Sequence, residues 1–196
     1  MRPVRPALAI MAKEPVPGRT KTRLEPLLGP EGAARLYRCL LLDTIELAAA
    51  VPDVDVILAI DPATSGAYFT ELAPGLPQLV QTGAALGDRL DNVLAELLDR
   101  GHPAAAAIGS DAPTLPPDHI AAAFRRLAEG DADTVLGPAD DGGYHLIAVT
   151  SRPGPVTTEV TMSTPEVLAD TMAVAERTGR RVALGPPWYD VDEPAD

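Results

Sequence analysis

Short apolar runs typical of β-strands alternate with longer segments of helical pattern along this 196-residue chain. In the helical segments, apolar residues recur at steps of three and four, so they share one helical face. Strands and helices in alternation predict a mainly parallel sheet with helices on both faces. The predicted strands are 8–11, 54–60, 78–81, 104–109, 134–136, 144–149 and 181–184, and the predicted helices are 30–50, 86–98, 116–129 and 163–178.

The alternation is broken where the predicted strands 134–136 and 144–149 follow each other without a helix. They are joined by Gly-Pro-Ala-Asp-Asp-Gly-Gly at 137–143, a composition that favours a turn. A strand that reverses direction there would make the sheet mixed. The length of the chain predicts one domain over residues 1–196.

The acidic composition limits the partners that we expect. The formal net charge is -12, and nucleic-acid binding depends on basic surface, so no nucleic acid is expected. No apolar stretch approaches the ~20 residues that span a bilayer, and the run at 7–12 is too short for a signal peptide. The single cysteine, Cys39, excludes an internal disulfide and fits a reducing compartment, so we expect a cytoplasmic location. Its helical position predicts a buried thiol.

Four cationic residues gather in the loop 13–23, directly after the first predicted strand, against the overall charge of the chain. They are Lys13, Arg19, Lys21 and Arg23. Open α/β sheets bind ligands beyond the carboxyl ends of their strands. We therefore expect this loop to bind an anionic ligand, with a nucleotide polyphosphate as the first candidate. A solvated basic loop without a ligand is the alternative.

Three carboxylates are candidates for a metal site. Asp111 follows the apolar run 104–108, and a carboxylate at the end of a strand can hold a hard cation such as Mg²⁺. Asp190 and Asp192 flank Val191, so on an extended strand both would point to one side. With Asp111 they could bind Mg²⁺ or Mn²⁺. The alternatives are a helix-capping role for Asp111 and an exposed acidic tail for the other two.

The turn at 137–143 and the start of the last predicted helix could bind an acceptor molecule. The N–H groups of Gly142 and Gly143 could cradle a carboxylate or phosphate. Ser163 is the predicted N-cap of the helix 163–178, where anions also bind. A turn without a ligand explains the glycines equally well. His145 has no visible nucleophile or orienting partner, so a role as catalytic base is not favoured.

Five motifs in order resemble one family. They lie at 13–24, 109–115, 137–144, 163–171 and 190–192, and they look like the rSAM/selenodomain-associated transferase family. That family is similar to the nucleotide-diphospho-sugar transferases of the GT-A fold and to the 2-phospholactate and molybdenum-cofactor guanylyltransferases. The resemblance implies a Rossmann-like GT-A fold, a three-layer α/β/α sandwich with a mainly parallel sheet, and it also implies a bound nucleotide and a divalent metal.

The residues around Asp111 bear on the type of transfer. Metal-dependent GT-A glycosyltransferases carry Asp-x-Asp at this place, whereas here the second acidic position is Pro113. The single Asp followed by Pro is closer to the guanylyltransferases. The basic loop also resembles the nucleotidyltransferase loop that holds NTP phosphates, and four cations suit a departing pyrophosphate.

The predicted function is therefore nucleotidyl transfer from an NTP to a small anionic acceptor, with release of pyrophosphate. The alternatives are glycosyl transfer from an NDP-sugar and a nucleotide-binding module without catalysis. Oligomeric state is open, with a homodimer as one option. The predicted catalytic residues are Lys21, Arg23 and Asp111; the nucleotide-binding residues are Lys13, Gly18, Arg19, Lys21, Arg23 and Ser110; the acceptor-binding residues are Gly142, Gly143 and Ser163.

Overall fold

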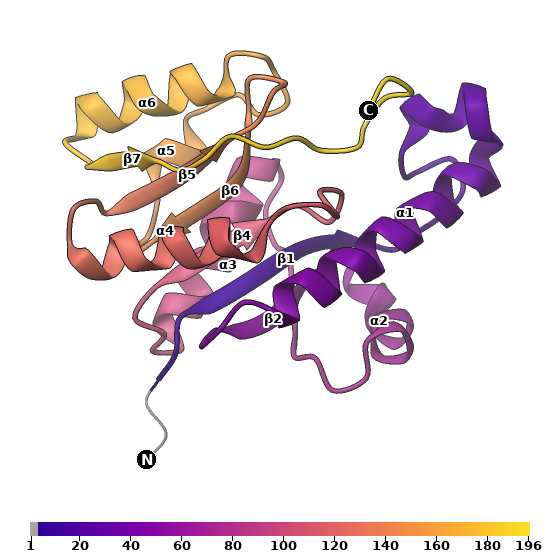
Figure 1. Cartoon of the computed structure of the whole chain (residues 1–196), viewed down its shortest axis with the longest axis horizontal. Coiled ribbons are helices and arrows are strands. Elements are labelled where there is room, and N and C mark those ends of the chain that lie inside the picture. Colours follow the sequence, from indigo (N-terminus) through magenta and orange to yellow (C-terminus); the bar gives the residue numbers. More distant parts are fainter. Residues whose placement is uncertain (1–3) are drawn as a thin grey trace.

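A seven-stranded sheet forms the centre of the computed structural model, which describes residues 4–196. Its strand order is β3-β2-β1-β4-β6-β5-β7 (Figure 1). All seven predicted strands are present, with ends that differ by a few residues. Their bounds are β1 Ala7–Lys13, β2 Asp55–Asp61, β3 Gln78–Val80, β4 Ala105–Ile108, β5 Thr134–Pro138, β6 Tyr144–Val149 and β7 Val182–Leu184.

The sheet is mixed, as the turn at 137–143 suggested. β1 pairs in parallel with β2 and β4, β2 with β3, and β5 with β7. β6 runs antiparallel to both of its neighbours, β4 and β5. A short turn can join only antiparallel neighbours, because a parallel connection must run back along the length of the strands and needs about a dozen residues or more. The prediction of a mainly parallel α/β sheet with one reversed strand is confirmed.

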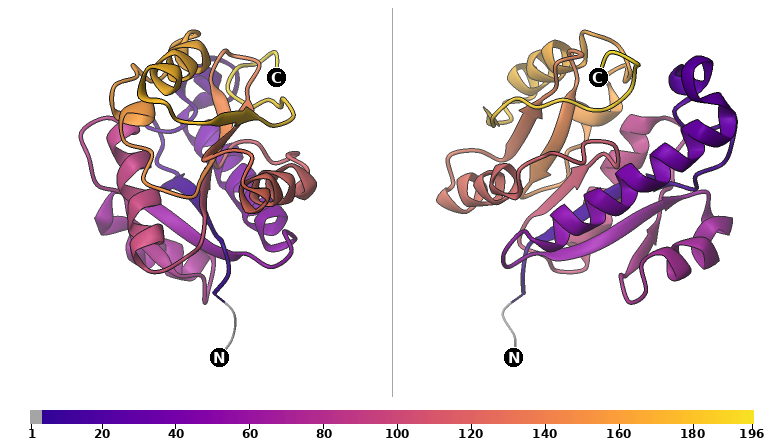
Figure 2. Two further views of the ribbon diagram at one scale, coloured as in Figure 1. Left: turned by 90° about the vertical axis from the view of Figure 1, so that its left-hand side faces the viewer. Right: turned by 45° about the vertical axis from the view of Figure 1, so that its right-hand side comes forward.

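Helices cover both faces of the sheet (Figure 2). The core on one face contains residues of α1 (Glu25–Ala49), α2 (Gly66–Leu72) and α4 (Pro117–Glu129). The core on the other face contains residues of α3 (Leu86–Asp99) and α6 (Val167–Thr178). The short helix α5 (Pro155–Thr158) contacts α3 and α6, and two 3-10 turns, η1 (Thr22–Leu24) and η2 (Ala63–Ser65), precede α1 and α2. The predicted three-layer α/β/α arrangement is confirmed.

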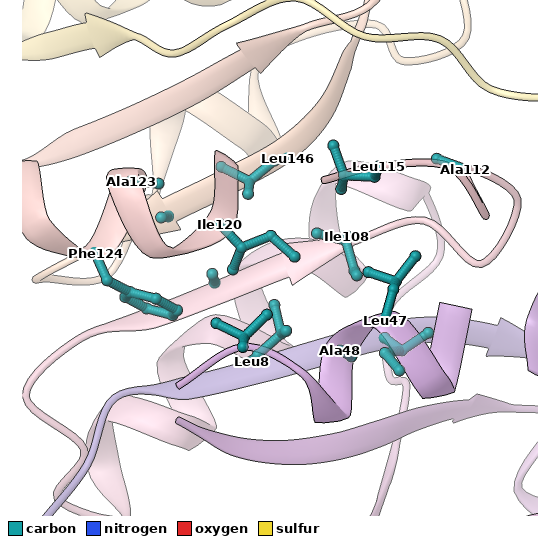
Figure 3. Close-up of a cluster of buried hydrophobic side chains, with 14 of the residues drawn as sticks. Leu8, Leu47, Ala48, Ile108, Ala112, Leu115, Ile120, Ala123, Phe124 and Leu146 are labelled. Carbon is teal, nitrogen blue, oxygen red and sulfur yellow. The ribbon is translucent and has the colours of Figure 1, made fainter. Parts of the chain in front are cut away.

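Alternation along the strands explains the two cores. Leu8 of β1 faces α1 and α4, where it packs near Leu47 and Ile120 (Figure 3). Its chain neighbours Ala7 and Ala9 belong to the core under α3, because successive side chains of a strand point to opposite faces. Burying a leucine such as Leu8 contributes about 1.5–3 kcal/mol. The two cores fix the sheet and hence the edge at which its strands end.

Three local expectations are wrong. The last long helix begins at Val167, with Glu166 as its N-cap; Ser163 has φ 64°, outside the extended region of an N-cap. The first helix begins at Glu25 and bends at Gly29. Cys39 is exposed, because the buried face of α1 carries other positions, among them Tyr37, Leu40, Leu41 and Thr44.

A buried carboxylate joins α3 to the segment after β6. The Asp91 side chain is only 4% exposed, and it accepts hydrogen bonds from Arg152 Nε and from the N–H of Gly154, both at 2.8 Å. Asparagine at this position would present an amide to these donors. Asp91→Asn is therefore expected to lower the free energy of unfolding by about 2–3 kcal/mol, measured by urea denaturation.

The matched control for Asp91→Asn is Glu96→Gln on the same helix. Glu96 forms an exposed pair with Arg100 at 2.9 Å, and such pairs contribute less than about 0.5 kcal/mol. Equal losses in the two variants would contradict a structural role for the buried pair.

Within residues 4–196, no helix combines the length and the apolar character that crossing a bilayer requires.

Candidate active site

A cavity of about 730 Å³ opens at the carboxyl ends of β1 and β4. One part of its wall is the basic loop, with Lys13, Arg19, Lys21 and Arg23. Ser110, Asp111 and Asp192 also line it, and Ser163 contributes from the loop before α6. The structure thus brings most of the predicted site residues to one cavity, as expected for an open α/β sheet. Gly18, Gly142, Gly143 and Asp190 do not line it.

Lys21 lies between two of the predicted metal ligands. Its Nζ donates to Asp111 Oδ2 at 2.7 Å and also to Asp192 Oδ1, and the side chain is only 5% exposed. Burial by itself would lower the pKa of Lys21, but the two carboxylates outweigh it and raise the pKa above its ordinary value. Lys21 is therefore a charged ammonium within the acidic cluster.

Backbone hydrogen bonds bring the C-terminal segment to this cluster. The Trp188 N–H donates to Pro138 O at the end of β5, and the Val191 N–H donates to Asp111 O, each at 2.9 Å. No strand forms at 190–192, so the expected strand is wrong, although Asp190 and Asp192 do face one common cavity. Asp192 instead reaches Lys21 because Val191 is tied to the loop that carries Asp111.

The surroundings of Asp190 disfavour a negative charge on its carboxyl group. Burial, followed by the charges of Asp111 and Asp192, raises its pKa to about 7, and its buried Oδ1 has no hydrogen-bond partner. Among residues 4–196, no three acidic, histidine or cysteine side chains form a ready-made metal site. The Lys21 ammonium lies between Asp111 and Asp192.

The raised pKa of Asp190 predicts how the metal-free protein responds to pH. The folded state keeps a proton that the unfolded state loses near pH 4, so stability should fall as pH rises from about 4 to about 7 and then level off. Asp190→Asn should remove this slope and stabilise the protein at pH 8 by a few kcal/mol. Urea denaturation at pH 5 and pH 8, with a chelator present, measures both effects. A fall in stability from pH 5 to pH 8 that is as large in the variant as in the wild type would contradict the raised pKa of Asp190.

Ser110 lines the cavity, but its hydroxyl is engaged. Ser110 Oγ lies 2.7 Å from the Tyr37 hydroxyl, which accepts the Lys13 N–H at 3.0 Å. Both side chains are buried, and burial raises the pKa of Tyr37. This chain of contacts fixes the end of β1 against the end of β4. Gly18 has φ 76° and shapes the basic loop.

The two glycines predicted to bind an acceptor molecule instead donate their N–H groups to oxygen atoms of the chain. The Gly142 N–H donates to Ala139 O at 3.1 Å, and the Gly143 N–H donates to Asp141 Oδ1 at 2.9 Å. Neither N–H is free to cradle an anion in this structure. Gly142 also packs so closely on Pro165 that a Cβ would lie 2.0 Å from its carbonyl oxygen. For Ser163, which does line the cavity, acceptor binding stays a prediction.

Several lining residues were not predicted from the sequence. Gln81, Leu86 and Arg89 also line the cavity, and Arg89 Nη1 lies 2.6 Å from Asp61 Oδ2. Gln81 ends the predicted strand 78–81 and the other two residues follow it, so the carboxyl-end rule that selected the 13–23 loop could have selected them too. Asp141 also lines the cavity, although the sequence interpretation singled out its glycine neighbours.

A second cavity of about 400 Å³ adjoins the acidic cluster. Arg23 and Tyr189 line it together with six carboxylates, those of Asp140, Asp141, Asp190, Asp192, Glu193 and Asp196. His145 lines neither cavity; it is buried beside Pro186 O, at 3.3 Å, and burial lowers its pKa. The structure therefore gives His145 a packing position, in line with the sequence interpretation.

A comparison with known protein families identifies the family of this chain. The family described as "Uncharacterized protein conserved in bacteria (DUF2064)" matches residues 44–164. The chain belongs to this family. Its matched region runs from α1 to the loop before α6, so it includes Asp111 and the turn at 137–143. A search of the curated proteins found no match to this DUF2064 protein.

Solved structures share the fold of this DUF2064 protein. A protein of Desulfovibrio desulfuricans G20, described as a candidate nucleotide-diphospho-sugar transferase, is 29% identical over 96% of this chain and 82% of its own, with a TM-score of 0.88. A 4-diphosphocytidyl-2C-methyl-D-erythritol synthase is 14% identical over 100% and 96%, with a TM-score of 0.65. A CMP:2-keto-3-deoxy-manno-octonic acid synthetase solved with CTP is 14% identical over 97% and 94%, with a TM-score of 0.61.

These similarities confirm the broader part of the resemblance seen in the sequence, namely the Rossmann-like fold of the nucleotide-diphospho-sugar transferases. At 14% identity the two synthases show a common fold alone. The narrower relationship to the rSAM/selenodomain-associated transferases and to the guanylyltransferases stays a prediction.

Proposed function

We propose that this protein is a nucleotidyltransferase that uses an NTP and a divalent cation, Mg²⁺ or Mn²⁺, to modify a small-molecule acceptor. The observation that carries the proposal is the meeting of the basic 13–23 loop with Asp111 and Asp192 in one cavity at the carboxyl ends of β1 and β4. A volume of about 730 Å³ lies in the range of small-molecule and cofactor sites, about 300–1,000 Å³.

The cations of the loop would hold the phosphates. Lys13, Arg19 and Arg23 line the cavity, and none of them is buried. Arginine binds phosphate oxygens with two parallel N–H groups and lysine acts as a point charge. We assign pyrophosphate to this side of the cavity, where these charges would stabilise it as it leaves.

The acidic residues have the chemistry that a divalent cation needs. Asp111, Asp190 and Asp192 offer hard oxygen ligands, Asp190 Oδ1 is buried without a partner, and a positive charge already lies between the other two carboxylates. A bound cation would supply neutralisation of the phosphate charge. The chain would supply the three carboxylates that hold it and the backbone contact between Val191 and Asp111 that fixes two of them.

Transfer would then proceed by attack of an acceptor oxygen on the α-phosphorus in line with the departing pyrophosphate. Positioning and electrostatic stabilisation carry such a reaction, so no base of the chain is required. The second cavity, which shares Arg23, Asp141 and Asp192 with the first, is the place that we assign to the acceptor. Because carboxylates dominate its wall, an anionic acceptor could approach only when a cation offsets them.

Glycosyl transfer from an NDP-sugar is the second candidate. It is favoured by the similarity to the D. desulfuricans protein, which is described as a nucleotide-diphospho-sugar transferase candidate. Against it stands Pro113 in place of a second acidic residue after Asp111. A binding module without catalysis is the third candidate, and it gives no reason for Asp111 and Asp192 to lie beside a phosphate-binding loop.

A thermal-shift panel distinguishes the three candidates. The four NTPs, the matching NDPs and common NDP-sugars are each tested with and without Mg²⁺. A ligand at 100 times its Kd adds about 2.7 kcal/mol of stability, or about 5–10 °C in Tm for a domain of this size. The largest Mg²⁺-dependent shift with one NTP, followed by pyrophosphate release with an acceptor, supports nucleotidyl transfer. A larger shift with an NDP-sugar supports glycosyl transfer, and shifts without turnover support a module. No shift with any ligand rejects the proposal.

A further inference from the structure

Lys21 differs from the other cations of its loop in what it contacts. Its side chain is 5% exposed and bonded to two carboxylates. Arg23 is 66% exposed and lies 3.9 Å from Asp192. Lys13 and Arg19 make no ion pair within residues 4–196. A loop that only presented charge to phosphates would keep all four ammonium and guanidinium groups open to the cavity.

The contacts of Lys21 occupy the oxygen atoms that a metal would need. Its Nζ bonds to one oxygen of Asp111 and one of Asp192, two of the three carboxylates assigned to the divalent cation. Two positive charges within a few ångströms of each other repel strongly in a partly buried site. The site can therefore hold the Lys21 ammonium or a divalent cation, but not both.

The backbone at Lys21 fits a residue that changes position. Lys21 has φ 50° and ψ 43°, a left-handed conformation that costs a non-glycine residue about 1–2 kcal/mol. Such conformations persist where surrounding interactions hold them, and here those interactions are the bonds to Asp111 and Asp192. The next residues are anchored independently, because Leu24 is buried at the end of η1.

We infer that Lys21 is an exchangeable counter-ion: it neutralises Asp111 and Asp192 in the nucleotide-free protein and moves to the NTP phosphates when a divalent cation takes its place. This inference rests on the proposed function, since it presupposes a nucleotide and a cation at this site. It makes metal and nucleotide binding cooperative. The cation binds less tightly because it must displace Lys21. When a nucleotide is present, its phosphates bind the released ammonium, and this contact compensates for the weaker cation binding.

Direct measurement of Mn²⁺ binding tests the exchange without any assay of turnover. Free Mn²⁺ is quantified by electron paramagnetic resonance in titrations of the wild type and of Lys21→Met, with and without the NTP chosen by the thermal-shift panel, or with each of the four NTPs in turn. Without nucleotide, Lys21→Met should bind Mn²⁺ at least about tenfold more tightly than the wild type. With NTP, the wild type should gain about 5–150-fold in Mn²⁺ affinity, and the variant should gain less.

Arg19→Met is the matched control. It removes one positive charge from the same loop without removing a contact to either carboxylate, so its Mn²⁺ affinity without nucleotide should stay within about threefold of the wild type. Lys21→Gln repeats the test with a polar side chain, and thermal melts of every variant establish that it is folded.

The outcomes separate the inference from the proposed function. Equal or weaker Mn²⁺ binding by Lys21→Met, with an NTP-dependent gain still present, overturns the exchange and leaves the nucleotidyltransferase standing. Mn²⁺ binding only to the Lys21 variants, even with NTP, also overturns it, because Lys21 would then replace the cation permanently. If no protein binds Mn²⁺ under any condition, the metal part of the proposed function fails and the exchange fails with it.

Discussion

Replacement of Asp111 by asparagine is expected to lower the rate of pyrophosphate release about 10²–10³-fold, the scale of removing one electrostatic group from a transition state. Asp111 is bonded to Lys21 and lines the cavity beside the basic loop. Asparagine keeps the shape of the side chain but cannot supply the negative charge that a divalent cation binds. The fold should be unaffected, because the Val191 N–H bonds to the main-chain oxygen of this residue.

The measurement is pyrophosphate release from the NTP that gives the largest thermal shift, with the small-molecule fraction of a bacterial extract as the source of acceptor. Asp118→Asn is the control: Asp118 lies in the first turn of α4, just after the same loop, and lines neither cavity. It should leave the rate within about twofold, as is usual for a surface change. A rate for Asp111→Asn equal to that of the control would reject Asp111 as a metal ligand.

The second large effect concerns stability. Gly142→Ala is expected to lower the free energy of unfolding by about 3 kcal/mol or more, because two costs combine. Gly142 has φ 88°, which an alanine adopts at a cost of about 1–2 kcal/mol. Its added Cβ would also lie 2.0 Å from the carbonyl oxygen of Pro165 and 2.7 Å from the carbonyl carbon. That contact is to backbone, so the loop before α6 would have to move.

Gly75→Ala separates the two costs. Gly75 also has φ 88°, but nothing lies within 4 Å of its Cβ position, so only the conformational cost of about 1–2 kcal/mol should remain. Urea denaturation of both variants measures the difference. If the two lose the same stability while Gly142→Ala loses activity, then Gly142 binds the acceptor as the sequence interpretation held, and its packing role is rejected.

The sequence was sufficient for most of the fold. The strands could be predicted because each is a short apolar run between turn residues, and the reversal at β6 because 137–143 is too short for a crossover. The helices α2 and α5 were missed, since segments of seven and four residues are too short to show a helical period. The start of α6 was misplaced because Ser163-Thr-Pro-Glu fits a capping box in sequence, whereas the backbone turns left-handed at Ser163.

The sequence predicted which residues belong to the candidate site, but it did not predict the contacts between them. The carboxyl-end rule selected the basic loop and Asp111, which do share a cavity. The bonds from Lys21 to Asp111 and Asp192 join residues separated by 90 and 171 positions, and no local pattern encodes them. The sequence interpretation therefore assigned the cations to phosphate and the carboxylates to metal as separate sets, although in the folded chain one of the cations already binds the carboxylates.

Two parts of the chain, before and after the strand reversal at β6, contribute different residues to the cavity. The residues before β5 contribute the basic loop, Gln81, Arg89 and Asp111, and the residues after β5 contribute Asp141, the loop at 163–165 and Asp192. Under the proposed function, the first part would choose the nucleotide and the second would choose the molecule that receives it. Chimeras that exchange the second part between relatives would therefore be expected to change the acceptor and keep the nucleotide donor. Their design would have to preserve the pairing of β4 with β6.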